Sequence, residues 1–234
     1  MRAAARGCCA WEVHARTNFS SGFTHASEGG ARADDVATCI CAVLLAEACD
    51  TGFEPLIRRD HPALRRSRQS WVWQNYIRAE TLPRSNATLV AAQDRIPLAR
   101  AWGGGDVASA DGLRFMVPVR TIHTAPNPRY YGQESGVTFD NLVSDQFTGL
   151  NGITVPGILS DSLILLSVLL EQQTELQPAE IMSDTGAYTD TIFGIFHLLG
   201  YPFSPRLADI GGSRFWRVDG KANYGAIRGL ASQG

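Results

Sequence analysis

The sequence predicts an α/β fold in which a mixed sheet with helices on its faces follows a mostly helical region. Hydrophobic residues recur at helical spacing through about the first hundred residues, whereas short alternating runs typical of strands begin near Leu113. Between the two patterns lies Trp102-Gly103-Gly104-Gly105, which we interpret as a flexible junction because no phosphate-loop lysine follows the glycines. We therefore expect a helical region over 1–105 and an α/β core over 106–234.

Composition favours a folded protein outside the membrane. The chain has 234 residues, 44% of them hydrophobic and 9% aromatic, which argues against general disorder. Its most apolar run, Leu163 to Leu170, is too short to cross a bilayer, and Met1 to Ala10 lacks the apolar segment of a secretory signal. We expect a soluble, cytoplasmic protein with no membrane partner. The five cysteines lack the spacing of a zinc site, so Cys39, Cys41 and Cys49 are expected as ordinary thiols in an apolar helix.

Three helices are expected in the first region. Asp34 and Asp35 are placed to cap a helix from Val36 to Ala48, which Asp50-Thr51-Gly52 ends. Apolar residues surround that helix, so we expect it to be buried. Two further helical stretches are expected near 68–80 and 85–94, with aromatic residues in the core: Trp71, Trp73 and Tyr76.

The second region alternates strands and helices. The expected strands are Leu113–Thr121, Val137–Asp145, Gly152–Val155, Glu180–Ser183 and Arg206–Ile210. The expected helices run from Leu163 to Leu176, after the capping residues Asp161-Ser162 and before Pro178, and from Asp190 to Leu199, before Gly200. This order matches the ribonuclease H-like fold, in which the first and fourth strands lie side by side.

Two carboxylates stand out in this arrangement. Asp111 opens the first expected strand and Asp184 ends the fourth, so neighbouring strands would bring them together. Two like charges repel at short range, and a divalent cation relieves the repulsion, since hard oxygen ligands favour Mg²⁺ or Mn²⁺. A pair of such ions supports phosphodiester transfer. On spacing alone a second interpretation stays open, because aspartate followed closely by glycine is also typical of turns.

A basic stretch in the helical region is a candidate DNA-contacting surface. Residues 1–110 carry 13 basic and 11 acidic groups, whereas residues 111–234 carry 8 and 12. The densest basic stretch holds Arg58, Arg59, Arg65, Arg66 and Arg68. These side chains could bind phosphates, or they could form a solvated helix face.

The residues around the two aspartates resemble a known family. The matching stretches include His14-Ala15-Arg16-Thr17, Trp73 to Thr81, Ser109 to Phe115, Gly149 to Gly186, Ser204 to Ile210 and Arg214-Phe215-Trp216. From about His14 to Tyr224 the chain resembles the transposases of the Tn-3 family. The resemblance implies a DDE active site whose metal-binding triad cuts transposon ends and joins them to target DNA. Asp111 matches the first aspartate of the triad and Asp184 the second.

The third member, a glutamate, is expected beyond the last residue of this sequence. No glutamate follows Glu180. We expect Asp190 to cap the helix that it begins, and the resemblance matches Asp209 and Asp219 to positions that are not catalytic, so none of the three is a convincing substitute. We therefore expect an internal fragment with an incomplete ribonuclease H-like core and exposed apolar surface, inactive alone. The sequence departs from the family pattern at two further positions. Asp140 stands where we expect an aromatic residue, and Ser160 stands where we expect arginine.

Three functions stay open. The chain is a metal-dependent transposase or its remnant, with Mg²⁺ or Mn²⁺ as cofactor and transposon-end and target DNA as partners. Alternatively it is a non-catalytic module that binds DNA, another copy of itself or an intact transposase. The third possibility is the product of a decayed reading frame.

Overall fold

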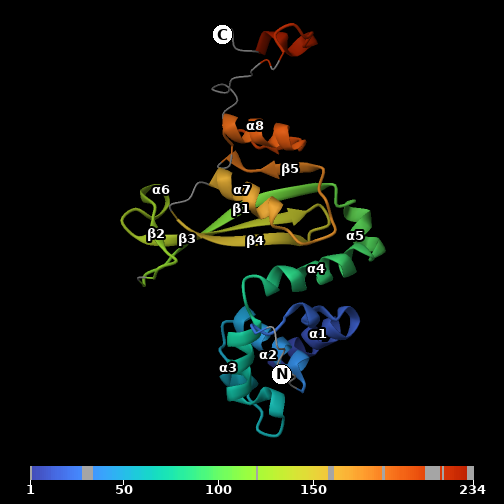
Figure 1. The fold of residues 1–234 in the computed structure, drawn as a ribbon, viewed down its shortest axis with the longest axis vertical. Helices are drawn as coiled ribbons and strands as arrows, with labels where there is room; N and C mark the ends of the chain where they lie inside the picture. Colours follow the sequence, from blue (N-terminus) through green and yellow to red (C-terminus); the bar gives the residue numbers. More distant parts are fainter. Residues whose placement is uncertain are drawn as a thin grey trace.

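The computed structural model describes residues 2–27, 34–119, 121–157, 161–185, 188–208, 217 and 219–230. The α-helices are α1 (Arg2–Thr17), α2 (Val36–Ala48), α3 (Arg66–Tyr76), α4 (Thr81–Asp94), α5 (Pro97–Trp102), α6 (Pro128–Tyr131), α7 (Asp161–Leu170) and α8 (Asp190–Leu199). The strands are β1 (Val107–Met116), β2 (Ala125–Pro126), β3 (Ser135–Ser144), β4 (Gly149–Pro156), β5 (Glu180–Ser183) and β6 (Phe203–Pro205). Helices thus dominate the first part of the chain and a mixed sheet the second (Figure 1).

The sheet places strands that are distant in sequence side by side. Its order is β2-β3-β1-β5-β6, with β4 paired to β3. The β1–β3 and β3–β4 pairs are antiparallel, whereas β1–β5 and β5–β6 are parallel. The expected adjacency of the first long strand and the strand at Glu180–Ser183 is confirmed.

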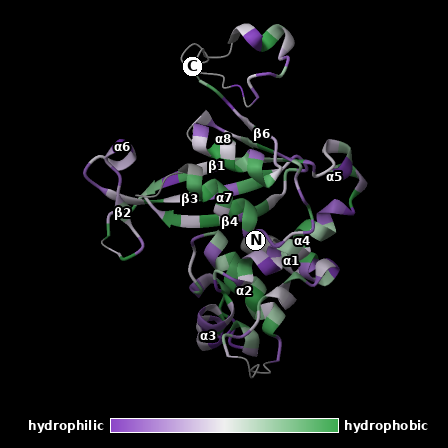
Figure 2. Cartoon of the chain, turned by 45° about the horizontal axis from the view of Figure 1, so that its top comes forward, coloured by the Kyte–Doolittle hydropathy of each residue, from purple (hydrophilic) through white to green (hydrophobic). Residues whose placement is uncertain are grey.

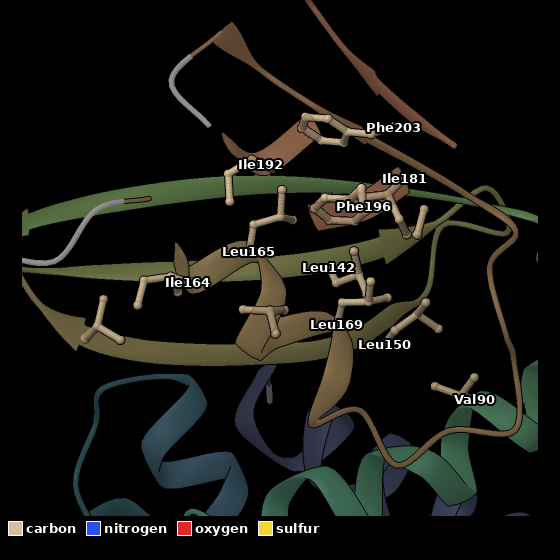
Figure 3. Close-up of a cluster of buried hydrophobic side chains, with 13 residues drawn as sticks. Val90, Leu142, Leu150, Ile164, Leu165, Leu169, Ile181, Ile192, Phe196 and Phe203 are labelled. Carbon is tan, nitrogen blue, oxygen red and sulfur yellow. The ribbon is translucent and has the colours of Figure 1, made fainter. Parts of the chain in front are cut away.

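One face of the sheet is covered by α7 and α8, whose side chains form the main core. Figure 3 shows Leu165 and Leu169 of α7 beside Leu142 of β3, with Phe196 of α8 next to Ile181 of β5. Leu142, Ile181 and Phe196 are completely buried. Burying such side chains contributes about 1.5–3 kcal/mol each, so this core fixes where β1 and β5 lie.

The opposite face of the sheet is open among the described residues. On β1 the alternating side chains of Ser109, Asp111, Leu113 and Phe115 are exposed, whereas those between them are buried or half-buried. Leu113 is 49% exposed and Phe115 53%. The expectation of exposed apolar surface is therefore confirmed at this face.

The helical region has a core of its own and meets the sheet through α4. Its buried residues include Ile40 and Val43 of α2, which confirms that α2 is surrounded by neighbours. Burial raises the pKa of the Cys39 and Cys41 thiols to about 11, so both stay protonated at neutral pH. The Asn86 amide of α4 donates to the Gly149 carbonyl, 2.7 Å away, at the start of β4.

Several expected details of the helical region are wrong. Asp35 does not cap α2 with its side chain: its φ is 53° and it makes no capping hydrogen bond. The stretch expected as one helix to Glu80 ends at Tyr76, because the Thr81 hydroxyl donates to the Tyr76 carbonyl, 2.7 Å away. A new helix, α4, begins at Thr81 rather than at Ser85. Trp73 was expected in the core and is 43% exposed.

Other boundaries differ in the second region. β1 begins at Val107, so Asp111 lies inside the strand rather than opening it. Helix α7 ends at Leu170, well before Pro178, and Gln172 and Thr174 turn their side chains to the Leu176 carbonyl. The last strand is Phe203–Pro205 rather than Arg206–Ile210, of which 209 and 210 lie outside the described residues. Ser160 and the side chains of Asp161 and Ser162 are also outside them.

The glycine run between the two regions is packed closely against the β3–β4 turn. The Gly105 amide donates to the Asp145 carboxylate at 2.9 Å. A Cβ on Gly103 would lie 2.3 Å from Asp145 Cγ, so any larger residue would force the Asp145 side chain to move. Close approach therefore explains a glycine that the sequence suggested was there for flexibility.

Within the described part of the chain, none of the helices combines the length and apolarity needed to cross a membrane.

Candidate active site at the edge of the sheet

The two predicted aspartates lie on neighbouring parallel strands. In the β1–β5 register the last pair is Ala110 with Ser183, so Asp111 and Asp184 are the next residue of each strand segment. Both are exposed, and both line the same pocket. The structure therefore brings together two residues that are distant in sequence.

The pocket lies beside the part of β1 that extends beyond the end of β5. β5 stops opposite Ala110, whereas β1 continues to Met116 while paired with β3. Within the described ranges, no strand pairs with the β5 side of β1 beyond Ala110. The pocket can therefore be lined by residues from both faces of the sheet: Ala110, Asp111, Gly112, Arg114, Asp140, Asn141, Leu165, Val168 and Asp184.

Local hydrogen bonds hold each aspartate's segment in place. The Gly112 amide donates to Asp111 Oδ1 at 2.8 Å. The residues beside Asp184 bind the chain just after β6: the Arg206 amide donates to the Ser183 carbonyl at 2.8 Å, and the Thr185 hydroxyl donates to the Arg206 carbonyl at 2.8 Å. The strand positions therefore depend on contacts that flank the carboxylates.

A third carboxylate, that of Asp140, lines the pocket but belongs to the other face of the sheet. Asp140 opposes Gly112 in the β1–β3 register, whereas Asp111 opposes Asn141. Since side chains of opposed residues share a face and neighbours alternate, Asp140 and Asp111 project to opposite faces. Asp140 is only 7% exposed, and its Oδ1 would lie 2.8 Å from a Cβ on Gly112. Glycine at 112 leaves the space that this buried carboxylate needs.

The donor set suits a hard divalent cation but is incomplete. Asp111 and Asp184 supply carboxylate oxygens, and the Asn141 amide lies opposite Asp111. Such oxygens are what Mg²⁺ and Mn²⁺ prefer. Across the ranges that the structure describes, no three His, Cys, Asp or Glu side chains are grouped to hold an ion. The residues present fit part of a metal site, with two carboxylates rather than three.

Asp140, Asn141 and Arg114 belong to the pocket but were not predicted as site residues. The signal that could have found them is the pairing of β1 with β3, because it sets Asn141 opposite Asp111. That register depends on where β1 starts, which the sequence placed too late. Alternation within β1 would likewise have put Arg114 on the face of Gly112.

Of the other acidic residues, Asp190 lies in the first turn of α8 but does not cap it. The Thr189 hydroxyl accepts from the Ile192 amide and is the cap, whereas Asp190 accepts a hydrogen bond from Tyr188 at 3.2 Å. Desolvation, and then that hydrogen bond, raise the pKa of Tyr188. Asp209 lies outside the described residues.

The basic stretch lies in the helical region, away from the residues that line the pocket. Arg66 forms an ion pair with Glu54. Arg68 donates to the Asp34 carbonyl at 3.1 Å and lies 4.8 Å from the Trp71 ring centroid. The remaining three are exposed and form no ion pair within the described residues: Arg58, Arg59 and Arg65.

Comparison with known proteins identifies the family of the chain. The profile of the Tn3 transposase DDE domain matches residues 10–234, so the chain belongs to that family. It is 57% identical over 220 residues to the transposase for transposon gamma-delta of Escherichia coli (strain K12), which covers 94% of this chain and 22% of that protein.

Two further relatives show the same coverage. The transposase for transposon Tn4556 of Streptomyces fradiae is 42% identical over 94% of this chain and 25% of its own length. The transposase for transposon Tn3926 of Escherichia coli is 33% identical over 94% of this chain and 22% of its own length. The chain thus spans between a fifth and a quarter of the relatives it matches.

Proposed function

We propose that this chain supplies part of the catalytic core of a DNA transposase, with Asp111 and Asp184 as two of its metal ligands. The observation that carries the proposal is the parallel register of β1 and β5, which makes the two carboxylates neighbours at one pocket. Membership of a DDE domain family supports the same assignment. The strand order, in which β1, β3 and β4 are antiparallel neighbours and β1, β5 and β6 parallel ones, supports a ribonuclease H-like core over 106–234, preceded by the helical region over 1–105.

The proposed substrates are transposon ends and target DNA, consistent with relatives named as transposases. Bound Mg²⁺ or Mn²⁺ would activate the attacking oxygen and stabilise the leaving oxygen of a phosphodiester. Asp111 and Asp184 would hold the ion, with Asn141 beside Asp111 on the same face. We propose that the chain acts in the cytoplasm. Its proposed protein partner is another copy of itself or an intact transposase.

The chain on its own should not cut or join DNA, because two carboxylates hold paired cations less well than three. We expect the purified chain to leave transposon-end DNA intact in Mg²⁺ or Mn²⁺. A chimera in which it replaces the matching segment of the gamma-delta transposase should join ends to target DNA, and Asp111→Asn or Asp184→Asn in the chimera should abolish joining. Asp60→Asn, at an exposed position in the helical region, is the matched control. Joining by the Asp111→Asn chimera that equals joining by the parent chimera would contradict the assignment.

A non-catalytic DNA-binding role is the second candidate, favoured by exposed Arg58, Arg59 and Arg65. If these side chains contact phosphates, Arg59→Gln should weaken DNA binding and lower the slope of log affinity against log salt by about 0.9. A gel-shift titration at two salt concentrations measures this. Unchanged binding would leave Arg59 as part of a solvated surface.

A further inference from the structure

A cluster of cationic and aromatic side chains adjoins the carboxylate pocket. Arg114 lies on β1 three residues after Asp111 and lines the same pocket. Its guanidinium carbon is 3.9 Å from the centroid of the Tyr130 ring, within the range of a cation–π contact. Tyr130 therefore holds a positive charge at the edge of the proposed active site.

A second guanidinium group, that of Arg129, lies near the same ring. The Arg129 guanidinium carbon lies 5.2 Å from the Tyr130 centroid. Two guanidinium groups on one ring make this surface cationic, and an anion beside them is attracted to it. Guanidinium groups bind phosphate through paired N–H donors, so the arrangement suits a phosphodiester backbone.

Two residues of this cluster, Arg129 and Tyr130, lie on a segment that is anchored to the sheet by a buried side chain. We name the described residues between β1 and β3, 117–119 and 121–134, which contain β2 and α6, the arm. Tyr131 anchors the arm: it is 5% exposed, and its hydroxyl donates to the Val137 carbonyl at 2.8 Å. Cβ atoms on Gly136 and Gly157 would lie 2.5 and 2.4 Å from its ring, so only glycine admits the ring at both positions.

A second contact fixes the start of α6. The Asn127 amide donates to the Gly157 carbonyl at 2.5 Å, while its oxygen accepts from the Arg129 amide at 3.2 Å. The buried Tyr131 and the Asn127 cap thus present Arg129 and Tyr130 on a fixed support.

The arm projects from the end of the sheet at which the pocket lies. Figures 1 and 2 show α6 and β2 at one end of the strands and α5 at the other. Since β1 and β5 are parallel, the arm leaves β1 at the end where Asp184 follows β5. A DNA strand bound along the unpaired edge of β1 would contact both the carboxylates and the arm.

The pocket itself is rich in negative charge. Three carboxylates line it: Asp111, Asp140 and Asp184. Without neighbouring cations they repel the phosphates of a DNA substrate. We propose that Arg114 and Arg129, aligned by Tyr130, form a phosphate-binding surface that holds the DNA backbone beside the carboxylate pocket. This inference rests on the proposed function and adds residues that it did not include.

DNA binding without metal tests the inference. Fluorescence anisotropy with a labelled DNA duplex, in EDTA and at salt between roughly 50 and 200 mM, gives affinity and salt slope. We expect Arg129→Gln and Arg114→Gln each to weaken binding and to lower the slope by about 1, as loss of one phosphate contact does. Arg129 is exposed, so its substitution should leave the fold intact.

Arg95→Gln is the matched control, because Arg95 is an exposed arginine at the end of α4, close to α5 at the opposite end of the sheet. It removes the same charge and should change neither quantity. Equal slopes for Arg95→Gln, Arg114→Gln and Arg129→Gln would overturn the inference, as would absence of salt-dependent binding by the parent chain.

The role of Tyr130 as a positioning residue has its own readout. Tyr130→Phe keeps the aromatic face and should bind DNA like the parent, whereas Tyr130→Leu should weaken binding although no charge is lost. Equal affinity of the Phe and Leu variants would remove Tyr130 from the surface.

The two proposals fail separately. The anisotropy measurement contains no metal, so it does not depend on Asp111 and Asp184 as ligands. If the parent binds metal but the arginine substitutions do not change DNA binding, only the phosphate-binding surface is refuted. If the arginine substitutions weaken DNA binding but Asp111 and Asp184 do not bind metal, only the metal-ligand assignment is refuted.

Discussion

Asp111→Asn should lower the affinity of the chain for Mn²⁺ by on the order of tenfold or more, and Asp184→Asn should do the same. Each substitution replaces a carboxylate by a neutral amide at the pocket where the register of β1 and β5 makes the two residues neighbours. Affinity for hard cations depends on the number of charged ligands, and even groups behind the ligands change it by about 10–100-fold. Isothermal titration with Mn²⁺ measures the change.

Asp60→Asn serves as the control here too, since it removes one exposed carboxylate from the helical region. Its Mn²⁺ affinity should equal that of the parent. If the parent binds no Mn²⁺ at millimolar concentration, or if all three variants bind it equally, the carboxylate pair is not a metal site in this chain.

Phe196→Ala should destabilise the fold by about 3–5 kcal/mol, as truncation of a buried aromatic residue does. Phe196 is fully buried, and its ring stacks on Phe203 of β6 with centroids 4.6 Å apart and planes 11° from parallel. Because β6 pairs with β5, this contact also supports the strand that leads to Asp184. Urea unfolding monitored by circular dichroism gives the free energy of unfolding.

The same helix offers a matched comparison. Leu198 is 85% exposed, so Leu198→Ala removes apolar atoms without opening a cavity and should change stability by less than about 0.5 kcal/mol. Equal destabilisation by the two substitutions would mean that the α8 core contact does not support the sheet.

The sequence predicted best those elements whose own residues determine their ends. Helices α2 and α8 and strand β5 have the expected bounds. Asp50-Thr51-Gly52 and Gly200 stop the two helices, and glycine or aspartate in left-handed conformations is found there, with φ of 48° at Asp50 and 83° at Gly200. For β5, Pro178 before Glu180 and Asp184-Thr185-Gly186 after Ser183 marked the two ends in the sequence.

Elements that depend on tertiary contacts were predicted less well. β1 begins at Val107 because that segment pairs with both β3 and β5, a constraint that local alternation does not reveal. α7 ends at Leu170, although neither glycine nor proline interrupts the sequence before Pro178. The arm and its Tyr130 cluster depend on a buried Tyr131 fitting against two glycines, and no local pattern signals such a fit.

The candidate site was predictable in part. The topology inferred from element order brought Asp111 and Asp184 together, and resemblance to the family supplied their roles. The rest of the pocket, Asn141, Asp140 and Arg114, required the register of β1 on β3, and a strand placed a few residues too late gives no reliable register.

The parallel pairing of β1 with β5 has a consequence for the order of folding. β1, β3 and β4 pair as antiparallel neighbours, and the longer of the two connections between them is the arm. Asp111 and Asp184, by contrast, stand 73 positions apart (184 − 111), and closing a loop of that length costs about 4 kcal/mol in chain entropy, apart from a constant. We therefore expect the antiparallel strands to form early and the carboxylate pair to assemble late, when Ile181 docks in the core. Before β5 docks, Asp111 and Asp184 are not held beside each other, so the pocket that they share does not exist.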